Sequence, residues 1–281
     1  MKIGVIGLGL IGGSFAKTVK KNTEYQVFGY DINSVTVLKA QMTNAIDGVL
    51  DETTVKDIDL LVVATNPNVF LNAIERFLPL LKDGATVIDF CGTKKTVVSQ
   101  MKELLLVYPK LKFFGGHPMA GREFSGFDRS TSTLFSKASM IIVPINSDIF
   151  ENDRIKKFFL EIGFLEVVFT TSENHDKVIA YTSQLCHIVS NAFIKNKISR
   201  EHFGYSAGSY KDLTRVARLD SEMWSNLMIE NKENLLGELN ELIENLQVYK
   251  TALENGDKET LKQTLQEGSD IKIATDFNKV K

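Results

Sequence analysis

The first part of the chain alternates short apolar runs with stretches of helical periodicity. The apolar runs are typical of strands buried on both faces of a sheet, and they lie at residues 3–6, 26–30, 59–64, 85–89, 113–115, 139–144 and 165–169. Apolar residues at helical spacing predict intervening helices at residues 34–45, 67–81, 96–106 and 150–162. Strands that alternate with helices predict a parallel sheet with right-handed crossovers.

After about residue 170 the pattern becomes helical. It predicts helices at residues 172–196, 222–253 and 258–277, with Ser172 as the first N-cap and a stop at Asn255-Gly256-Asp257. We therefore predict two domains, residues 1–170 and residues 171–281. The helix at 222–253 carries a long apolar stripe, which favours burial against a second copy of the chain. A homodimer through the helical domain is the expected assembly.

Residues 2–31 predict a dinucleotide site. A strand is followed by Gly7, Gly9 and Gly12 in the pattern G-x-G-x-x-G, then by a helix and a second strand that ends at Asp31. The glycines suit a tight turn, a close approach to pyrophosphate and close packing of helix on strand. Asp31 lies about 20 residues beyond Gly12, where an acid accepts the ribose 2′-hydroxyl and repels a 2′-phosphate.

The prediction is a doubly wound Rossmann domain that binds NAD rather than NADP, joined to an all-helical domain. An ordinary loop acid is the alternative for Asp31. The predicted cofactor-binding residues are Gly7, Leu8, Gly9, Leu10, Ile11, Gly12, Asp31 and Thr65.

Composition narrows the class of protein. The 281 residues carry a net charge of -2, with 43% hydrophobic and 24% charged residues. This balance is typical of globular proteins and gives no basic surface for nucleic acid. Cys91 and Cys186 form no metal or disulfide motif, so we expect no metal and a cytoplasmic location. No apolar run is long enough to predict a membrane span, and cleavage of an N-terminal signal would destroy the glycine turn.

Two candidate catalytic segments follow predicted strands, at the sheet edge where ligands bind. Residues 89–95 contain Thr93, whose hydroxyl could cap the next helix or contact a substrate oxygen. Residues 115–126 surround His117 with four glycines and one proline. A neutral histidine beside a nicotinamide can accept a hydroxyl proton as hydride leaves the same carbon. A surface or structural histidine is the alternative.

A third segment, residues 208–215, lies in the helical part. Lys211 and Arg215 are four residues apart and share a helix face, together with the neighbouring Asp212. Arginine suits bidentate carboxylate binding, although such a charge cluster is usually a solvated face.

These motifs together resemble the prephenate dehydrogenase family of tyrosine biosynthesis. The matching parts are the glycine turn with Asp31, GGHPMAG at 115–121, SQLCH with His187, and YKDLTRVA at 210–217 followed by Met223-Trp224. The resemblance covers nearly the whole chain, and GGHPMAG and KDLTR are its specific parts. It implies a nucleotide domain, a helical dimerisation domain, and oxidative decarboxylation of prephenate to 4-hydroxyphenylpyruvate.

The resemblance also implies roles for individual residues. His117 matches the histidine that bonds the C4 hydroxyl of the substrate, and Thr93 falls where the family usually has a serine. Arg215 matches the arginine that binds a substrate carboxylate, and we expect it to face His117 across the nicotinamide ring. The other expected pocket residues are a second histidine, His187; two acids of an ionic network, Glu123 and Asp212; a tryptophan, Trp224; and the cations Lys211 and Arg122.

Several departures from the family pattern leave the substrate open. Gln184 and Cys186 replace a histidine and a proline, Lys94-Lys95 replaces a small residue and a lysine, and Arg122 replaces a small or amide residue. Arogenate, or both substrates as in a cyclohexadienyl dehydrogenase, is the alternative to prephenate. Hydroxyacid and imine reductases lack the two specific motifs. A non-catalytic NAD sensor would need neither His117 nor Arg215. We expect no regulatory domain after residue 281 and no chorismate mutase segment before residue 1.

Overall fold

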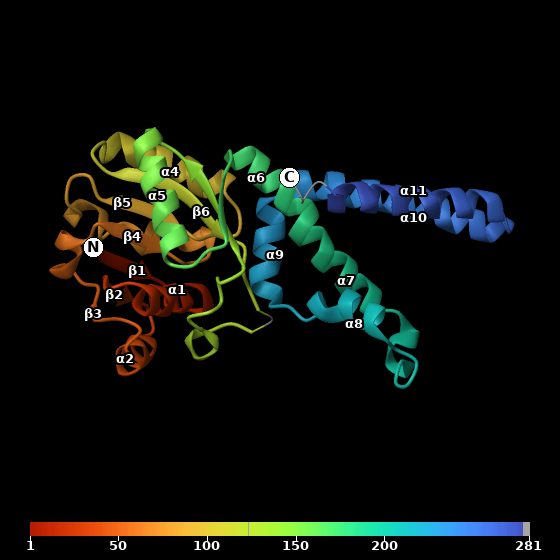
Figure 1. Ribbon diagram of the computed structural model, residues 1–281, viewed down its shortest axis with the longest axis horizontal. Helices are drawn as coiled ribbons and strands as arrows, with labels where there is room; N and C mark the ends of the chain where they lie inside the picture. The colour runs from red at the N-terminus through yellow and green to blue at the C-terminus, as the bar shows by residue number, and fades with distance from the viewer. Residues whose placement is uncertain (123, 278–281) are drawn as a thin grey trace. The chain divides into compact units, whose positions relative to one another are not determined.

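A computed structural model describes residues 1–122 and 124–277 (Figure 1). Within these residues the strands form one eight-stranded sheet with the order β3-β2-β1-β4-β5-β6-β7-β8. The strands are β1 (Lys2–Ile6), β2 (Gln26–Tyr30), β3 (Gly48–Val49), β4 (Leu60–Val63), β5 (Thr86–Asp89), β6 (Lys112–Pro118), β7 (Ser139–Pro144) and β8 (Glu166–Phe169). The predicted strands are all present, and the short β3 is added to them.

The helices follow the same alternation. Those interleaved with the strands are α1 (Leu10–Asn22), α2 (Ser34–Met42), α3 (Phe70–Ile74), α4 (Lys95–Val107) and α5 (Ile149–Glu161). The later ones are α6 (Ser172–Ile179), α7 (Cys186–Ile194), α8 (Gly208–Thr214), α9 (Ser221–Glu230), α10 (Lys232–Asn255) and α11 (Lys258–Phe277). Short 3₁₀ turns lie at Thr54–Asp57, Pro67–Val69, Leu78–Leu80, Phe127–Arg129, Lys197–Glu201 and Arg215–Ala217.

The sheet is parallel from β3 through β6, as predicted. β7 then pairs antiparallel with β6, and β8 runs parallel to β7. The irregular connection from β6 to β7 explains the reversal, because antiparallel neighbours need only a loop whereas parallel ones need a crossover. β6 is also longer than predicted and includes His117, which pairs with Ile141. A strand rather than a loop therefore positions this histidine.

Two apolar clusters cover the two faces of the sheet. One contains Phe15 of α1 and Phe159 of α5, packed with sheet residues such as Ile88. The other contains Phe70 of α3 and Met101 of α4. Helices on both faces explain why the strands read as continuous apolar runs rather than as alternating ones. The doubly wound Rossmann fold predicted from the sequence is confirmed.

Three predicted helices are interrupted. The one at 67–81 is short and irregular, because Pro79 cannot continue a helix interior. The one at 172–196 contains a π-helical turn, Ala180–Leu185, and its N-cap is Thr171 rather than Ser172. The one at 222–253 ends at Glu230 and restarts at Lys232. At this break the buried Asn231 amide donates to the Asp176 carbonyl and to Oε1 of Gln184.

The chain divides into two compact units, Met1–Asn231 and Lys232–Lys281. The predicted change from strands to helices falls inside the first unit, between Phe169 and Ser172. The second unit is a helical pair, α10 packed on α11, with Gly256 at φ 62° in the turn. No helix among the described residues is long and apolar enough to cross a membrane.

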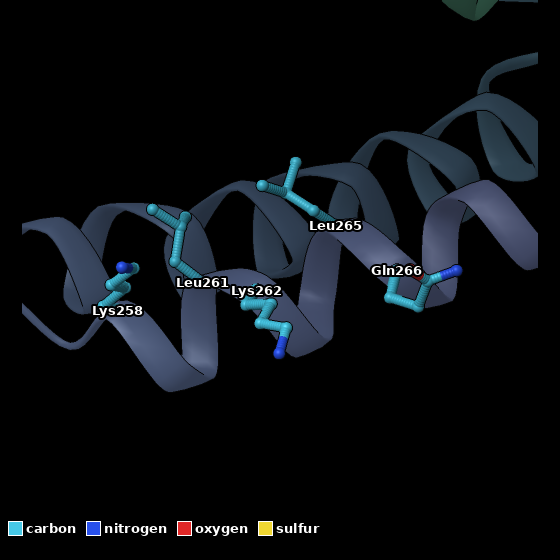
Figure 2. Close-up of a pocket in the computed structure, with 5 residues that line it drawn as sticks. All are labelled: Lys258, Leu261, Lys262, Leu265 and Gln266. Carbon is cyan, nitrogen blue, oxygen red and sulfur yellow. The ribbon is translucent and has the colours of Figure 1, made fainter.

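The helical pair exposes many apolar side chains: Leu236, Ile243, Leu246, Val248, Leu253, Leu265, Ile271 and Ile273. A shallow depression on α11 lies among Lys258, Leu261, Lys262, Leu265 and Gln266 (Figure 2). It contains no acid or imidazole, and we find no chemistry for it. The candidate site lies in the first unit.

Candidate active site

The glycine turn between β1 and α1 has the geometry of a dinucleotide site. Gly7 has φ 86°, a conformation that L side chains rarely adopt. A Cβ on Gly12 would lie 1.9 Å from the Gly7 carbonyl oxygen, so only glycine allows this contact. A Cβ on Gly9 would meet nothing within 4 Å, which leaves space beside the backbone. Leu10, Ile11 and Gly12 form the first turn of α1, where helical N–H groups suit a phosphate.

Asp31 lies beside this turn. Its Oδ2 accepts the Leu8 N–H at 2.8 Å, and its Oδ1 accepts the Asn33 N–H at 2.9 Å. Leu8 itself is fully buried, so its side chain belongs to the core and its backbone orients the acid. Each carboxylate oxygen keeps acceptor capacity for a further donor, such as a ribose hydroxyl. The carboxylate is thus fixed at the end of β2.

Thr65 adds a polar atom on the neighbouring strand end. Its Oγ1 is buried and has no hydrogen-bond partner among the described residues. A Cβ on Gly7 would lie 3.2 Å from the Thr65 methyl, so Thr65 borders the glycine turn. A buried hydroxyl without a partner is costly, and a polar group of a bound ligand would satisfy it. The turn, the acid and this hydroxyl together fit a dinucleotide.

His117 is the start of a hydrogen-bonded chain that runs into the helical part. Its Nδ1 lies 2.9 Å from Nε2 of His175 on α6, and Nδ1 of His175 lies 2.7 Å from Oδ1 of Asp176. His175 and Asp176 are buried, whereas His117 is partly exposed. The sequence reasoning missed both partners.

The surroundings keep the two imidazoles neutral near pH 7. Burial, then His175 and Lys94, lower the pKa of His117 well below its usual range. Burial is also the largest effect on His175 and lowers its pKa, while Asp176 works in the opposite direction. The pKa of Asp176 is lowered because donors from His175, Lys95 and Lys94 outweigh its burial. A neutral His117 is the form that can accept a proton.

A buried ion pair includes Lys94, whose charge acts on both histidines. Lys94 Nζ contacts Oδ2 of Asp89, and both side chains are fully buried. Asp89 also accepts the N–H groups of Cys91, which follows β5, and of Gly116, which lies within β6. These hydrogen bonds satisfy the remaining lone pairs of the Asp89 carboxylate, as a buried ion pair requires. The pair ties together the two strands that carry the site.

Thr93 is buried, and its Oγ1 donates to Oε2 of Glu230 on α9 at 2.5 Å. The capping alternative for Thr93 is wrong, because α4 begins at Lys95 with Lys94 as its N-cap residue. Asp176 instead accepts the N–H groups of Lys94 and Lys95 at 2.8 Å. A carboxylate from another helix therefore caps α4.

A second group of predicted residues lies around α7. The rings of His187 and Trp224 stack with centroids 3.8 Å apart, and Nδ1 of His187 donates to the Ser183 carbonyl. Burial first, and the nearby Arg215 guanidinium, lower the pKa of His187. His187, Trp224 and Arg215 are therefore neighbours. His187 is 12 residues beyond His175, which is about 18 Å along the helical run.

The remaining predicted residues are at the surface. Arg122, Lys211 and Asp212 are exposed, and Glu123 lies outside the described residues. Arg215 begins a 3₁₀ turn after α8, so it does not share a regular α-helical face with Lys211. Facing of His117 and Arg215 across a nicotinamide stays a prediction.

Phe124, which the sequence did not single out, follows the His117 strand in a loop. Its ring lies under two guanidinium groups, Arg129 at 5.1 Å and Arg218 at 5.0 Å. Arg218 follows the predicted 210–217 motif and precedes α9. These cation–π contacts join the loop to the helical part near the site.

Comparisons with known proteins agree with this geometry. A family model described as the prephenate dehydrogenase nucleotide-binding domain matches residues 15–165, and the prephenate dehydrogenase dimerization domain matches residues 171–267. Prephenate dehydrogenase of Lactococcus lactis subsp. cremoris is 28% identical over 99% of this chain and 78% of its own. Cyclohexadienyl dehydrogenase of Zymomonas mobilis is 29% identical over 97% of this chain and 95% of its own.

A solved structure extends the likeness to the whole fold. Prephenate dehydrogenase from A. aeolicus, crystallised with hydroxyphenyl propionate and NAD+, has a TM-score of 0.84, 28% identity and 98% coverage of both chains. The fold and the glycine turn define an NAD-dependent dehydrogenase. More specifically, the chain belongs to the prephenate dehydrogenase family. The predicted family, fold and cofactor are confirmed.

Proposed function

We propose that this protein converts prephenate, by oxidative decarboxylation, to 4-hydroxyphenylpyruvate in tyrosine biosynthesis. The observation that carries the proposal is the orientation of His117, whose Nδ1 is engaged by His175. Its Nε2 makes no hydrogen bond with the described residues and is the nitrogen left to meet a substrate hydroxyl. This base lies at the carboxyl end of the sheet, where a dinucleotide-binding fold brings its ligands together.

Different residues of the chain have different roles in the proposed reaction. When bound, NAD supplies the hydride acceptor for C4 of the substrate. His117 accepts or polarises the C4 hydroxyl proton, and decarboxylation then makes the ring aromatic. Alignment of C4 by the protein is worth roughly 7–11 kcal/mol, because a bound pose replaces an entropically costly encounter. We propose that Thr93 and the cofactor-binding residues predicted from the sequence help to hold the substrate and the cofactor in this alignment.

Arg215 is the proposed clamp for a substrate carboxylate. It lies near His187 and Trp224, at the other end of the helical run from His175. In this proposal the substrate hydroxyl lies at His117 and a substrate carboxylate is bound by the long side chain of Arg215. We assign Lys211, Asp212, Arg122 and Glu123 to the surrounding charged rim.

Arg215→Ala should raise the KM for the substrate at least tenfold and change kcat less, because the lost contact binds the ground state and the transition state alike. Steady-state kinetics with varied substrate concentration would measure the split. Lys157→Ala, which removes an exposed cation paired with Asp153 on α5, is the matched control. An unchanged KM for Arg215→Ala would place the clamp elsewhere.

Arogenate is the competing substrate, since its ammonium group replaces the ketone of prephenate. Purified protein should be offered each substrate with NAD and with NADP, and reduced cofactor followed by absorbance. We expect the highest kcat/KM for prephenate with NAD, because Asp31 repels a 2′-phosphate and Arg122 and His187 favour a ketoacid. A higher kcat/KM for arogenate would establish the alternative. No reduction with any pair would favour an NAD sensor.

We also propose a homodimer through the helical part, with residues 1–170 as the cofactor domain and 171–281 as the substrate and dimerisation domain. Exposed apolar side chains on α10 and α11 support this assembly, because patches of this kind are usually covered. A cytoplasmic location fits the free thiols of Cys91 and Cys186.

Light scattering should give twice the 31.4 kDa chain mass. Leu246→Glu and Leu253→Glu together should shift the mass toward one chain, because charge would be buried at the interface. Glu254→Gln on the same helix, exposed and paired with Lys250, is the control. A wild-type mass of one chain would contradict the proposed dimer.

A further inference from the structure

We propose that His175 and Asp176 act as a positioning and proton-holding pair that keeps His117 in its basic tautomer and receives a proton from it during turnover. This inference rests on the proposed function only for the identity of the hydroxyl. The hydrogen-bonded chain from Asp176 to His117 is present without any substrate.

The directions of the hydrogen bonds follow from one group. A carboxylate only accepts, so Nδ1 of His175 must donate to Asp176. In a neutral imidazole the other nitrogen then accepts, so Nε2 of His175 receives the Nδ1–H of His117. This leaves Nε2 of His117 unprotonated. The acid on α6 thus selects, through two rings, which nitrogen of His117 is the base.

The charged groups around the chain favour the inner histidine as the site of the proton. Asp176 contacts His175 directly, whereas the hydrogen-bond partner of His117 among the described residues is the neutral His175 ring. The cation of Lys94 is paired with Asp89, and Glu230 on α9 accepts the hydrogen bond of Thr93. An imidazolium at His175 therefore gains a carboxylate partner that an imidazolium at His117 lacks.

The proton balance of the reaction is consistent with temporary storage of one proton on His175. The C4 hydroxyl proton moves to Nε2 of His117 as the Nδ1 proton moves to Nε2 of His175. The C4 hydrogen leaves with its electron pair to reduce bound NAD, and the electron pair of the bond broken by CO2 release enters the ring. The resulting phenolate oxygen takes the proton back from Nε2 of His117. No proton is lost to solvent, and both rings regain their starting tautomers.

Asp176 also has a structural role as the cap of α4, so the test must separate the two roles. Asp176→Asn keeps one oxygen but replaces the other by NH₂. If NH₂ replaces Oδ1, it donates to Nδ1 of His175 and reverses both tautomers, but the buried Lys94 N–H then loses its acceptor. If it faces the Lys95 N–H, a buried donor is left without an acceptor. His175→Gln keeps an acceptor for His117 but cannot hold a proton, and His175→Leu removes both functions.

The decisive readout is ¹⁵N NMR of the imidazole nitrogens in the substrate-free full-length protein. We expect wild-type His117 as the Nδ1–H tautomer, and a gain of the Nε2–H tautomer in His175→Leu, which removes the acceptor of the Nδ1 proton. His187 and His202 are internal controls, because their ring bonds lie outside this chain. Asp153→Asn on α5 is the matched acid control and should change no ring tautomer. Thermal melting reports whether each variant folds.

Kinetics supply the second readout. His175→Leu and Asp176→Asn should lower kcat about 10²-fold or more, with KM within threefold of wild type. The kcat of His175→Gln should lie between the kcat of these variants and that of wild type. A wild-type His117 tautomer of Nε2–H would overturn the inference, as would kcat within threefold of wild type in folded His175→Leu. The NMR result stands even if the protein does not turn over prephenate, so the two proposals fail separately.

Discussion

Replacement of His117 by asparagine should lower kcat about 10²-fold or more, the scale expected for loss of a general base. Asparagine can still donate to His175, so the local hydrogen bond survives, but its amide cannot take a proton at neutral pH. Substrate affinity should change little, because the lost interaction strengthens only as the proton moves. Steady-state kinetics with prephenate and NAD would measure both quantities.

The dependence of kcat/KM on pH provides a control for the His117→Asn variant. The pKa of His117 is lowered in the folded protein, chiefly by burial, so the basic form persists as the pH falls below the usual histidine range. Wild-type kcat/KM should therefore begin to fall only below about pH 6.5, and His117→Asn should lack this acid limb. A loss of kcat smaller than threefold would defeat the assignment of His117.

Gly12→Ala should abolish NAD binding at concentrations that saturate the wild type. The new methyl would lie 1.9 Å from the Gly7 carbonyl oxygen and 3.0 Å from the Ala64 Cβ, and a backbone oxygen cannot turn aside. α1 must shift from β1, which moves the N–H groups that meet the pyrophosphate. Overpacking of this kind costs on the order of 1–3 kcal/mol of folding free energy. Calorimetric titration with NAD and thermal melting would measure the two effects.

Gly268→Ala on α11 is the matched control, because its added Cβ would meet nothing within 4 Å. It should leave NAD affinity unchanged and should not lower the melting temperature, since alanine favours a helix over glycine. Equal NAD affinity in Gly12→Ala and wild type would show that the glycine turn does not hold the cofactor.

The geometry of the glycine turn was predictable because its determinants are local. Gly7, Gly9 and Gly12 act within a single turn, and Asp31 follows on the adjacent strand. The family resemblance covered the remaining motifs. Continuous apolar runs likewise predicted buried strands, because helices cover both faces of the sheet.

The part of the candidate site around His117 was only partly predictable. His117 stood out among glycines, but its partner His175 is 58 residues away, and no spacing rule reports that contact. In the sequence, the signal for this contact was the adjacent pair His175-Asp176 near the start of a predicted helix. Its role became clear only in the structure, where Asp176 caps α4 and bonds His175. The break at Asn231 was missed for the same reason, since its side chain is held by Asp176 and Gln184 on distant segments.

The most direct test of the account is the stoichiometry of one reaction. Purified protein mixed with prephenate and NAD should form reduced cofactor, CO₂ and 4-hydroxyphenylpyruvate in equal amounts, and His117→Asn should form all three at the same reduced rate. Reduced cofactor without CO₂, or product formation at the wild-type rate by His117→Asn, would contradict it.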